Sequence, residues 1–87
     1  MDEILLKKIE QKIHDSISNQ DDIKELIKSL SSIDNSKSFA LGIVVGRLYN
    51  TFFYQSKRIL KREPTKQEFE DFLKYIENNK SDLERLW

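Results

Sequence analysis

The chain has 87 residues, of which 38% are hydrophobic and 34% charged, and its 15 basic and 15 acidic side chains give a formal net charge of zero. This length predicts one compact domain, residues 1–87, that buries only ~60% of its unfolded surface, so self-association is a natural source of added stability. Because cysteine is absent, a disulfide framework, a zinc–thiolate site and a thiol nucleophile are excluded. Two glycines and one proline are too few for a glycine-rich phosphate loop or a series of β-turns.

The N-terminal residues do not resemble a secretory signal, because Met1–Leu6 is followed by Lys7, Lys8 and Glu10 instead of a sustained apolar core. The longest apolar run, residues 39–46, is much shorter than the ~20 apolar residues that a spanning helix needs. We therefore expect no membrane span and a cytoplasmic location.

Apolar residues at helical spacing predict two helices in the first part of the chain, at roughly residues 2–17 and 20–33. Their apolar stripes differ in direction by about a quarter turn at 100° per residue. Ser18 and Asp21 have the form of a weak capping box for the second helix. The alternative is a single helix over residues 2–33, because the same positions also fit a heptad pattern.

The clearest predicted loop is residues 33–38, in which Ser36 or Ser38 would cap the helix that follows. That central helix, residues 39–62, is the longest of the chain and ends before Pro64, because proline disfavours helical geometry in the residue before it.

Thr65 and Glu68 form a full capping box, which predicts the start of a last helix. Its apolar stripe begins with Phe69 and Phe72. The polar residues 78–81 either interrupt this helix or belong to it. The terminal Leu86 and Trp87 either dock on the core or form a short apolar hook for a partner.

No segment shows the alternation of a strand, so we predict an all-α fold, a small bundle of three or four helices around the central helix of residues 39–62. The short connection at Pro64 predicts that the last helix folds back on the central one. That arrangement would bring Phe69, Phe72 and Ile76 against Phe52, Phe53, Ile59 or Leu60.

The central helix carries an apolar arc of about 160°, which is wide for a surface helix. The members of this arc are Leu41, Val45, Leu48, Tyr49, Phe52, Phe53, Ile59 and Leu60, together with Gly42 and Gly46. Each interior glycine costs ~1 kcal/mol relative to alanine, so the pair indicates that another backbone or a ring approaches closely. The approach is either intramolecular, with a helix crossing or a ring such as Phe69 or Tyr75, or a homodimer seam at Gly42, Gly46, Tyr49 and Phe53.

Charge is distributed unevenly along this neutral chain. Residues 36–66 carry seven basic and one acidic side chains, a net of +6, whereas residues 1–35 and 67–87 each carry a net of −3. The helical spacing predicts a basic face, defined by Arg47, Tyr54, Lys57, Arg58, Lys61 and Arg62. Such a face suits phosphate backbones or an acidic partner, although the acidic flanks can also neutralise it within the monomer.

The residues that carry catalytic chemistry do not form a convincing constellation. Glu10 and His14 are one helical turn apart, but His14 is the single histidine and is expected to face solvent. The carboxylates of the last helix belong to its first turn and outer face, where acids favour the helix dipole. We therefore expect no enzyme activity, no cofactor, no metal and no small-molecule substrate.

Two functional interpretations remain. The leading one is a small helical module for self-association or for binding a protein partner, based on the wide apolar arc and the glycine pair. The alternative is sequence-independent nucleic-acid binding through the basic face, with Tyr54 as a stacking residue.

Overall fold

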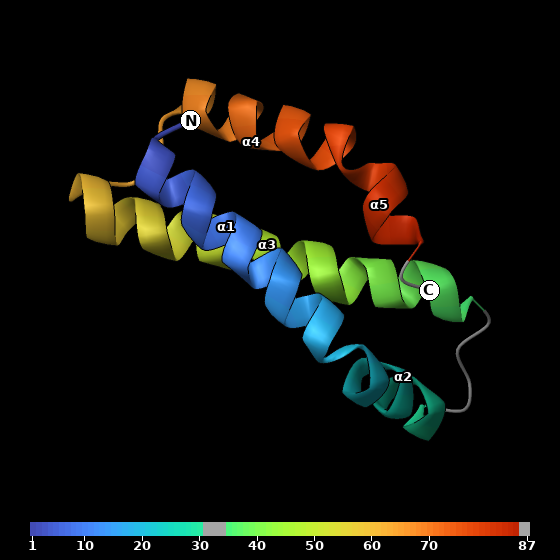
Figure 1. Cartoon of the computed structure of the whole chain (residues 1–87). Coiled ribbons are helices and arrows are strands. Elements are labelled where there is room, and N and C mark those ends of the chain that lie inside the picture. The colour runs from blue at the N-terminus through green and yellow to red at the C-terminus, as the bar shows by residue number, and fades with distance from the viewer. Residues whose placement is uncertain (31–34, 86–87) are drawn as a thin grey trace.

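The computed structural model describes residues 1–30 and 35–85. In these ranges the chain forms five helices and no strand: α1 (Glu3–Ser18), α2 (Gln20–Ser29), α3 (Ser36–Leu60), α4 (Lys66–Asn78) and α5 (Lys80–Glu84). Figure 1 shows α1 lying across the long α3, α2 extending from the end of α1, and α4 and α5 following one another along another side of the bundle. The predicted all-α class and the long central helix are confirmed. The predictions for Ile33, Asp34, Leu86 and Trp87 lie outside the described residues.

The chain breaks between α1 and α2 at Asn19, so the interpretation with two helices is confirmed. The backbone N–H of Asn19 donates to the carbonyl of Asp15 at 2.9 Å, and its own carbonyl accepts from Ile23 at 3.1 Å. Ser18 is still the last residue of α1, and no side chain caps α2. The predicted capping box of Ser18 and Asp21 is therefore wrong, because the turn is centred one residue later. Helix α2 ends at Ser29, earlier than residue 33.

Helix α3 begins and ends earlier than expected. Its N-cap is Asn35, whose side-chain oxygen accepts from the backbone N–H of Ser38 at 3.0 Å, so the prediction of a serine cap is wrong. An Asn side chain in this extended position satisfies a free N–H of the first turn and starts the helix sooner. At the other end Lys61 adopts the left-handed conformation (φ 61°), which terminates the helix at Leu60.

Helix α4 starts with the predicted capping box. The hydroxyl of Thr65 accepts from the N–H of Glu68 at 3.1 Å, and the carboxylate of Glu68 accepts from the N–H of Thr65 at 2.8 Å. The interruption left open at residues 78–81 occurs at Asn79, whose side chain donates to the carbonyl of Tyr75 at 2.8 Å. The short α5 follows.

The core lies between α1 and α3, which make the most extensive contact of any two helices in the described chain. The buried side of α3 is one row at four-residue spacing, Ala40, Val44, Leu48, Phe52 and Ser56. Of the predicted arc, only Leu48 and Phe52 are fully buried. The prediction of the buried side is therefore wrong in direction, because the true buried row lies further around the helix. The cause is size: the small Ala40 and Ser56, facing an α1 that also buries Ser16, allow the two backbones to come close.

Helix α4 folds back on α3 as predicted, and the contact is aromatic. Phe72 is fully buried and stacks on Phe52, with ring centroids 4.5 Å apart. Phe69 and Leu73, on the same helix, remain 36% and 48% exposed. The predicted stripe of α4 is therefore only partly buried.

Candidate functional site

The two glycines of α3 lie on the open surface. Both are exposed, and a Cβ atom built on either would have no heavy atom within 4 Å. Neither has a positive φ, so backbone freedom does not explain them. Within the part of the chain that the structure describes, the expected intramolecular crossing, or a ring of Phe69 or Tyr75 at the glycines, is not found.

Because glycine has no side chain, the row of α3 that contains Gly42 and Gly46 lies low between the neighbouring rows of side chains, and we call this row the trough. Ser38, Gly42, Gly46 and Asn50 follow one another at four-residue spacing, and all four are exposed. Apolar side chains border the trough on both sides, with Phe39 38% exposed on one border and Tyr49 46% exposed on the other. We call this side of α3 the glycine face, defined by Phe39, Gly42, Gly46, Tyr49 and Phe53.

Aromatic rings extend the glycine face toward α4. The ring of Tyr49 lies 6.4 Å from that of Phe53, and it meets the ring of Phe69 edge-on at 6.1 Å. A surface hollow beside them is lined by Tyr49, Phe52, Phe53, Pro64 and Phe69. The glycine trough therefore continues into an aromatic, incompletely covered surface.

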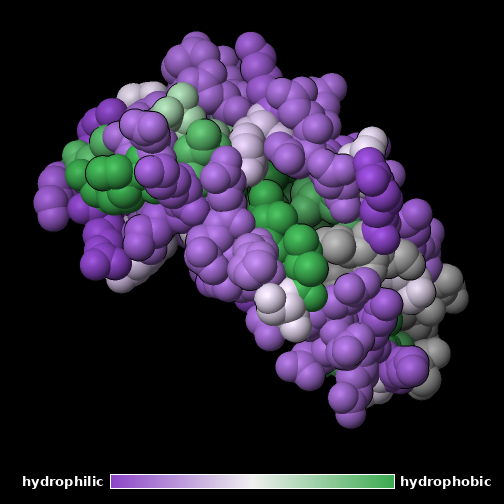
Figure 2. All heavy atoms as spheres, viewed as in Figure 1, coloured by the Kyte–Doolittle hydropathy of each residue, from purple (hydrophilic) through white to green (hydrophobic). Residues whose placement is uncertain are grey.

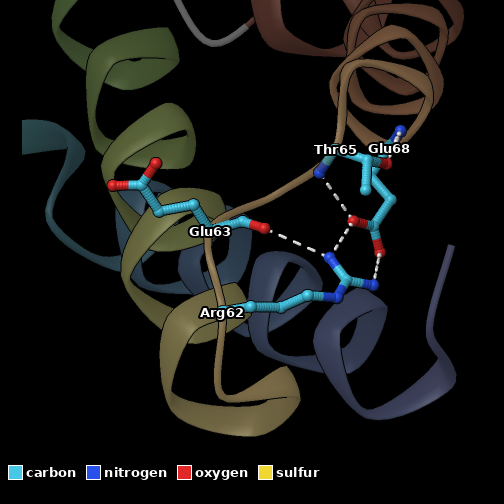
Figure 3. A network of polar contacts seen from close by, with 4 residues as sticks. All are labelled: Arg62, Glu63, Thr65 and Glu68. Atoms are coloured by element: carbon cyan, nitrogen blue, oxygen red, sulfur yellow. Dashed lines mark hydrogen bonds and ion pairs between the residues drawn. The ribbon is translucent and has the colours of Figure 1, made fainter.

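The structure divides the basic face, because Arg62 is held by an acidic neighbour. Its guanidinium donates to both carboxylate oxygens of Glu68, at 2.6 and 3.3 Å, and to the carbonyl of Glu63 at 3.1 Å (Figure 3). The hydrogen bond from Arg62, with the one from the backbone of Thr65, lowers the pKa of the Glu68 carboxyl from 4.5 to about 2. Arg62 thus supports the turn between α3 and α4.

The other members of the basic face form no ion pair within the described residues. Lys57, Arg58 and Lys61 are exposed, and Arg47 is half-buried. Tyr54 is 62% exposed, more than any other large hydrophobic or aromatic side chain described. The ammonium of Lys57 lies 5.6 Å from the centre of the Phe53 ring, which is within reach of a cation–π contact.

Lys8 and Lys12 of α1 lie beside the basic face. Nothing in the sequence connects them with it. A surface hollow between α1 and α3 is lined by Lys8, Gln11, Lys12, Asp15, Asn50, Thr51, Tyr54 and Gln55. A second hollow shares Asn50 and Tyr54 with it and adds Phe53, Lys57 and Arg58. The spacing of Lys8 and Lys12 places them on one side of α1. Only the packing of α1 on α3 shows that they lie near the cations of the basic face.

The remaining candidate residues do not assemble into a site. In residues 1–30 and 35–85, no three His, Cys, Asp or Glu side chains are grouped so that they could hold a metal ion. His14 is exposed, and burial, with a smaller contribution from the charge of Glu10, raises the pKa of the Tyr75 hydroxyl. The hydroxyl of Ser56 is buried without a hydrogen-bond partner in the described structure.

No helix in the described ranges combines the length and apolar character that crossing a membrane requires. Figure 2 views the molecule with α1 in front: most of this face is hydrophilic, and hydrophobic atoms gather at the end where α3 finishes and near the middle.

Comparisons of the chain with protein-family models, with curated proteins and with solved structures find no match. The function must therefore be argued from the geometry above.

Proposed function

We propose that this protein is a non-enzymatic helical module that self-associates through the glycine face of α3. The observation that carries the proposal is the open space at Gly42 and Gly46. Each glycine costs the exposed middle of a helix ~1 kcal/mol relative to alanine, and no contact within the described chain offsets that cost. Close approach by a second backbone is the physical advantage that a missing side chain provides.

The borders of the trough support a helix as the occupant. Helices pack by placing a row of side chains at four-residue spacing into a groove of the neighbouring helix. On α3 the glycine row is such a groove, and the row containing Tyr49 and Phe53 is such a ridge. One copy therefore carries both complementary parts, as the isologous contact of a two-fold dimer requires.

Size and surface chemistry favour the same conclusion. Burying Phe39, Tyr49 and Phe69 against another copy would remove apolar surface from water at about 25 cal/mol per Å². A small domain gains more from such burial than a large one does, because its own core is limited.

Sedimentation equilibrium of the parent and of a Gly46→Leu variant tests the proposal. We expect the parent to associate with rising concentration and Gly46→Leu to remain monomeric, because the new side chain fills the trough. Leucine is also a better helix former than glycine, so the isolated monomer should unfold at higher urea concentration than the parent monomer.

The matched control is His14→Leu, which places the same side chain on an exposed position of α1. It should associate like the parent. A parent that is monomeric at every concentration contradicts the proposal, and so does a Gly46→Leu variant that associates as tightly as the parent. Association of the parent with only a different protein would make the same surface a site for a protein partner instead of a second copy, and would overturn self-association.

A further inference from the structure

We propose a second interaction surface, which adjoins the glycine face: a cationic groove along α1 and α3 that binds the phosphate backbone of single-stranded nucleic acid, with Tyr54 as a stacking platform. The groove is defined by the residues that line the two adjoining hollows, with Lys8 and Lys12 on the α1 wall and Tyr54, Lys57 and Arg58 on the α3 wall.

Tyr54 stands between the two hollows. Asn50 and Tyr54 line both of them, with Lys8 and Lys12 at the hollow on the α1 side and Lys57 and Arg58 at the other, so a strand that occupies both hollows passes over the Tyr54 ring. Successive turns of a helix are ~5.4 Å apart, so Lys8 and Lys12 follow one another along α1 as Tyr54 and Arg58 do along α3. Cations therefore flank the path on both sides.

The balance of charge in the groove favours an anionic occupant. Among the residues that line it, Asp15 is the one acidic side chain, and it lies 3.9 Å from the ammonium of Lys12 while accepting from Gln11 at 3.0 Å. Lys8 and Arg58 have no acidic partner in the described structure. Cations without internal partners attract phosphates, and their binding releases the counterions that surround the nucleic acid.

Tyr54 indicates which anionic polymer fits. An aromatic ring that is 62% exposed in the middle of a cationic path offers a flat surface on which a base can stack. Each base of a single strand has a flat π-face that can stack on this ring, the charged groups of an acidic peptide have none, and the bases of a duplex are already stacked. The combination of cations with an exposed ring therefore favours a single strand, read without sequence preference.

The two surfaces adjoin at Asn50 and Phe53, and each is tested by variants of residues that belong to it alone. None of Lys8, Tyr54 and Arg58 belongs to the glycine face, so a monomeric Gly46→Leu protein should keep its affinity for the strand. Failure of self-association therefore leaves this proposal unaffected, and failure of strand binding leaves self-association unaffected.

Fluorescence anisotropy of a labelled oligothymidylate and a labelled oligouridylate, titrated with the full chain, provides the measurement. We expect binding at about 50 mM salt that weakens steeply toward about 200 mM. Tyr54→Ala should weaken binding about tenfold, whereas Tyr54→Phe, which keeps the ring, should bind like the parent. Lys8→Ala and Arg58→Ala should each reduce the slope of log affinity against log salt by about one.

Lys74→Ala is the matched control, because Lys74 is an exposed lysine of α4 without an ion pair in the described structure. It should bind like the parent. The proposal is overturned if neither strand binds at low salt, or if Lys74→Ala weakens binding as much as Lys8→Ala. It is equally overturned if polyglutamate or anionic lipid vesicles compete as well as a strand does and Tyr54→Ala has no effect.

Discussion

Phe52 of α3 and Phe72 of α4 stack with ring centroids 4.5 Å apart and ring planes 16° from parallel, and both side chains are fully buried. This contact is the fully buried part of the attachment of α4, whose Tyr75 and Ile76 also pack against the core while Phe69 and Leu73 remain largely on the surface. The aromatic border of the glycine face therefore depends on how α4 packs, and this pair of rings is one main contact in that packing.

We expect Phe72→Ala to lower the free energy of unfolding by ~3 kcal/mol or more, since it removes a buried ring and leaves a cavity. Leu73→Ala, next in sequence but 48% exposed, should cost much less. Urea denaturation of the two variants checks this. A Phe72→Ala protein as stable as the parent would mean that α4 does not depend on this contact.

Thr65→Ala should cost ~1 kcal/mol, because it removes the side-chain acceptor for the N–H of Glu68 at the start of α4. Thr65→Ser keeps a hydroxyl at the same position and should retain most of the stability. The same denaturation experiment measures both. Equal losses in the two variants would show that the hydroxyl is not what stabilises the turn.

The Arg62–Glu68 ion pair predicts a pH dependence. Because the folded-state pKa of Glu68 lies below its ordinary value of 4.5, its charge stabilises the fold above that pH, and the effect is lost as pH falls toward about 2. Glu68→Gln removes the charge but keeps a side-chain acceptor for the cap. The parent should be more stable than Glu68→Gln at pH 7, and the difference should vanish by about pH 2.

The size of that difference should be small and should fall with added salt, since the pair is exposed to solvent. Thermal unfolding of both proteins across the pH range provides the measurement. A stability difference that is the same at pH 7 and pH 2 would exclude an electrostatic contribution from Glu68.

Ser56→Ala should raise the free energy of unfolding by about 1 kcal/mol, because it removes a buried hydroxyl that has no partner in the described structure. Ser16 is the comparison: its buried hydroxyl donates to the carbonyl of Lys12 at 2.9 Å, so Ser16→Ala should not give the same gain. Chemical denaturation distinguishes them. A clear loss of stability in Ser56→Ala would show that its hydroxyl is satisfied in solution.

The capping box of Thr65 and Glu68 predicted the start of α4, because capping depends on residues three positions apart. The break before α2 was predicted from the change in direction of the apolar stripe, although the capping box proposed for it was wrong. Local signals failed for the orientation of α3. Hydropathy favours the aromatic Tyr49 over Ala40 and Ser56 as core, whereas the packed structure buries the two small residues and leaves Tyr49 46% exposed. The neighbouring helices decide which side of a helix is buried. A helical wheel of one segment contains no information about those neighbours.

The same limit applies to the candidate sites. The spacing within α3 placed Tyr54 and Arg58 on one side of the helix, and both line one surface hollow. It did not reveal that Arg62 pairs with Glu68 across a turn, or that Lys8 of α1 lines the same groove as Tyr54. These relationships arise from the arrangement of helices in space.

The most direct test of self-association through α3 is a dilution series of the isotope-labelled parent, followed by amide chemical shifts. We expect the amide resonances whose shifts change with concentration to cluster in residues 39–53 and around Phe69, and we expect Gly46→Leu to abolish these changes. Shifts confined to α2, or spectra that do not change up to the highest attainable concentration, would contradict it.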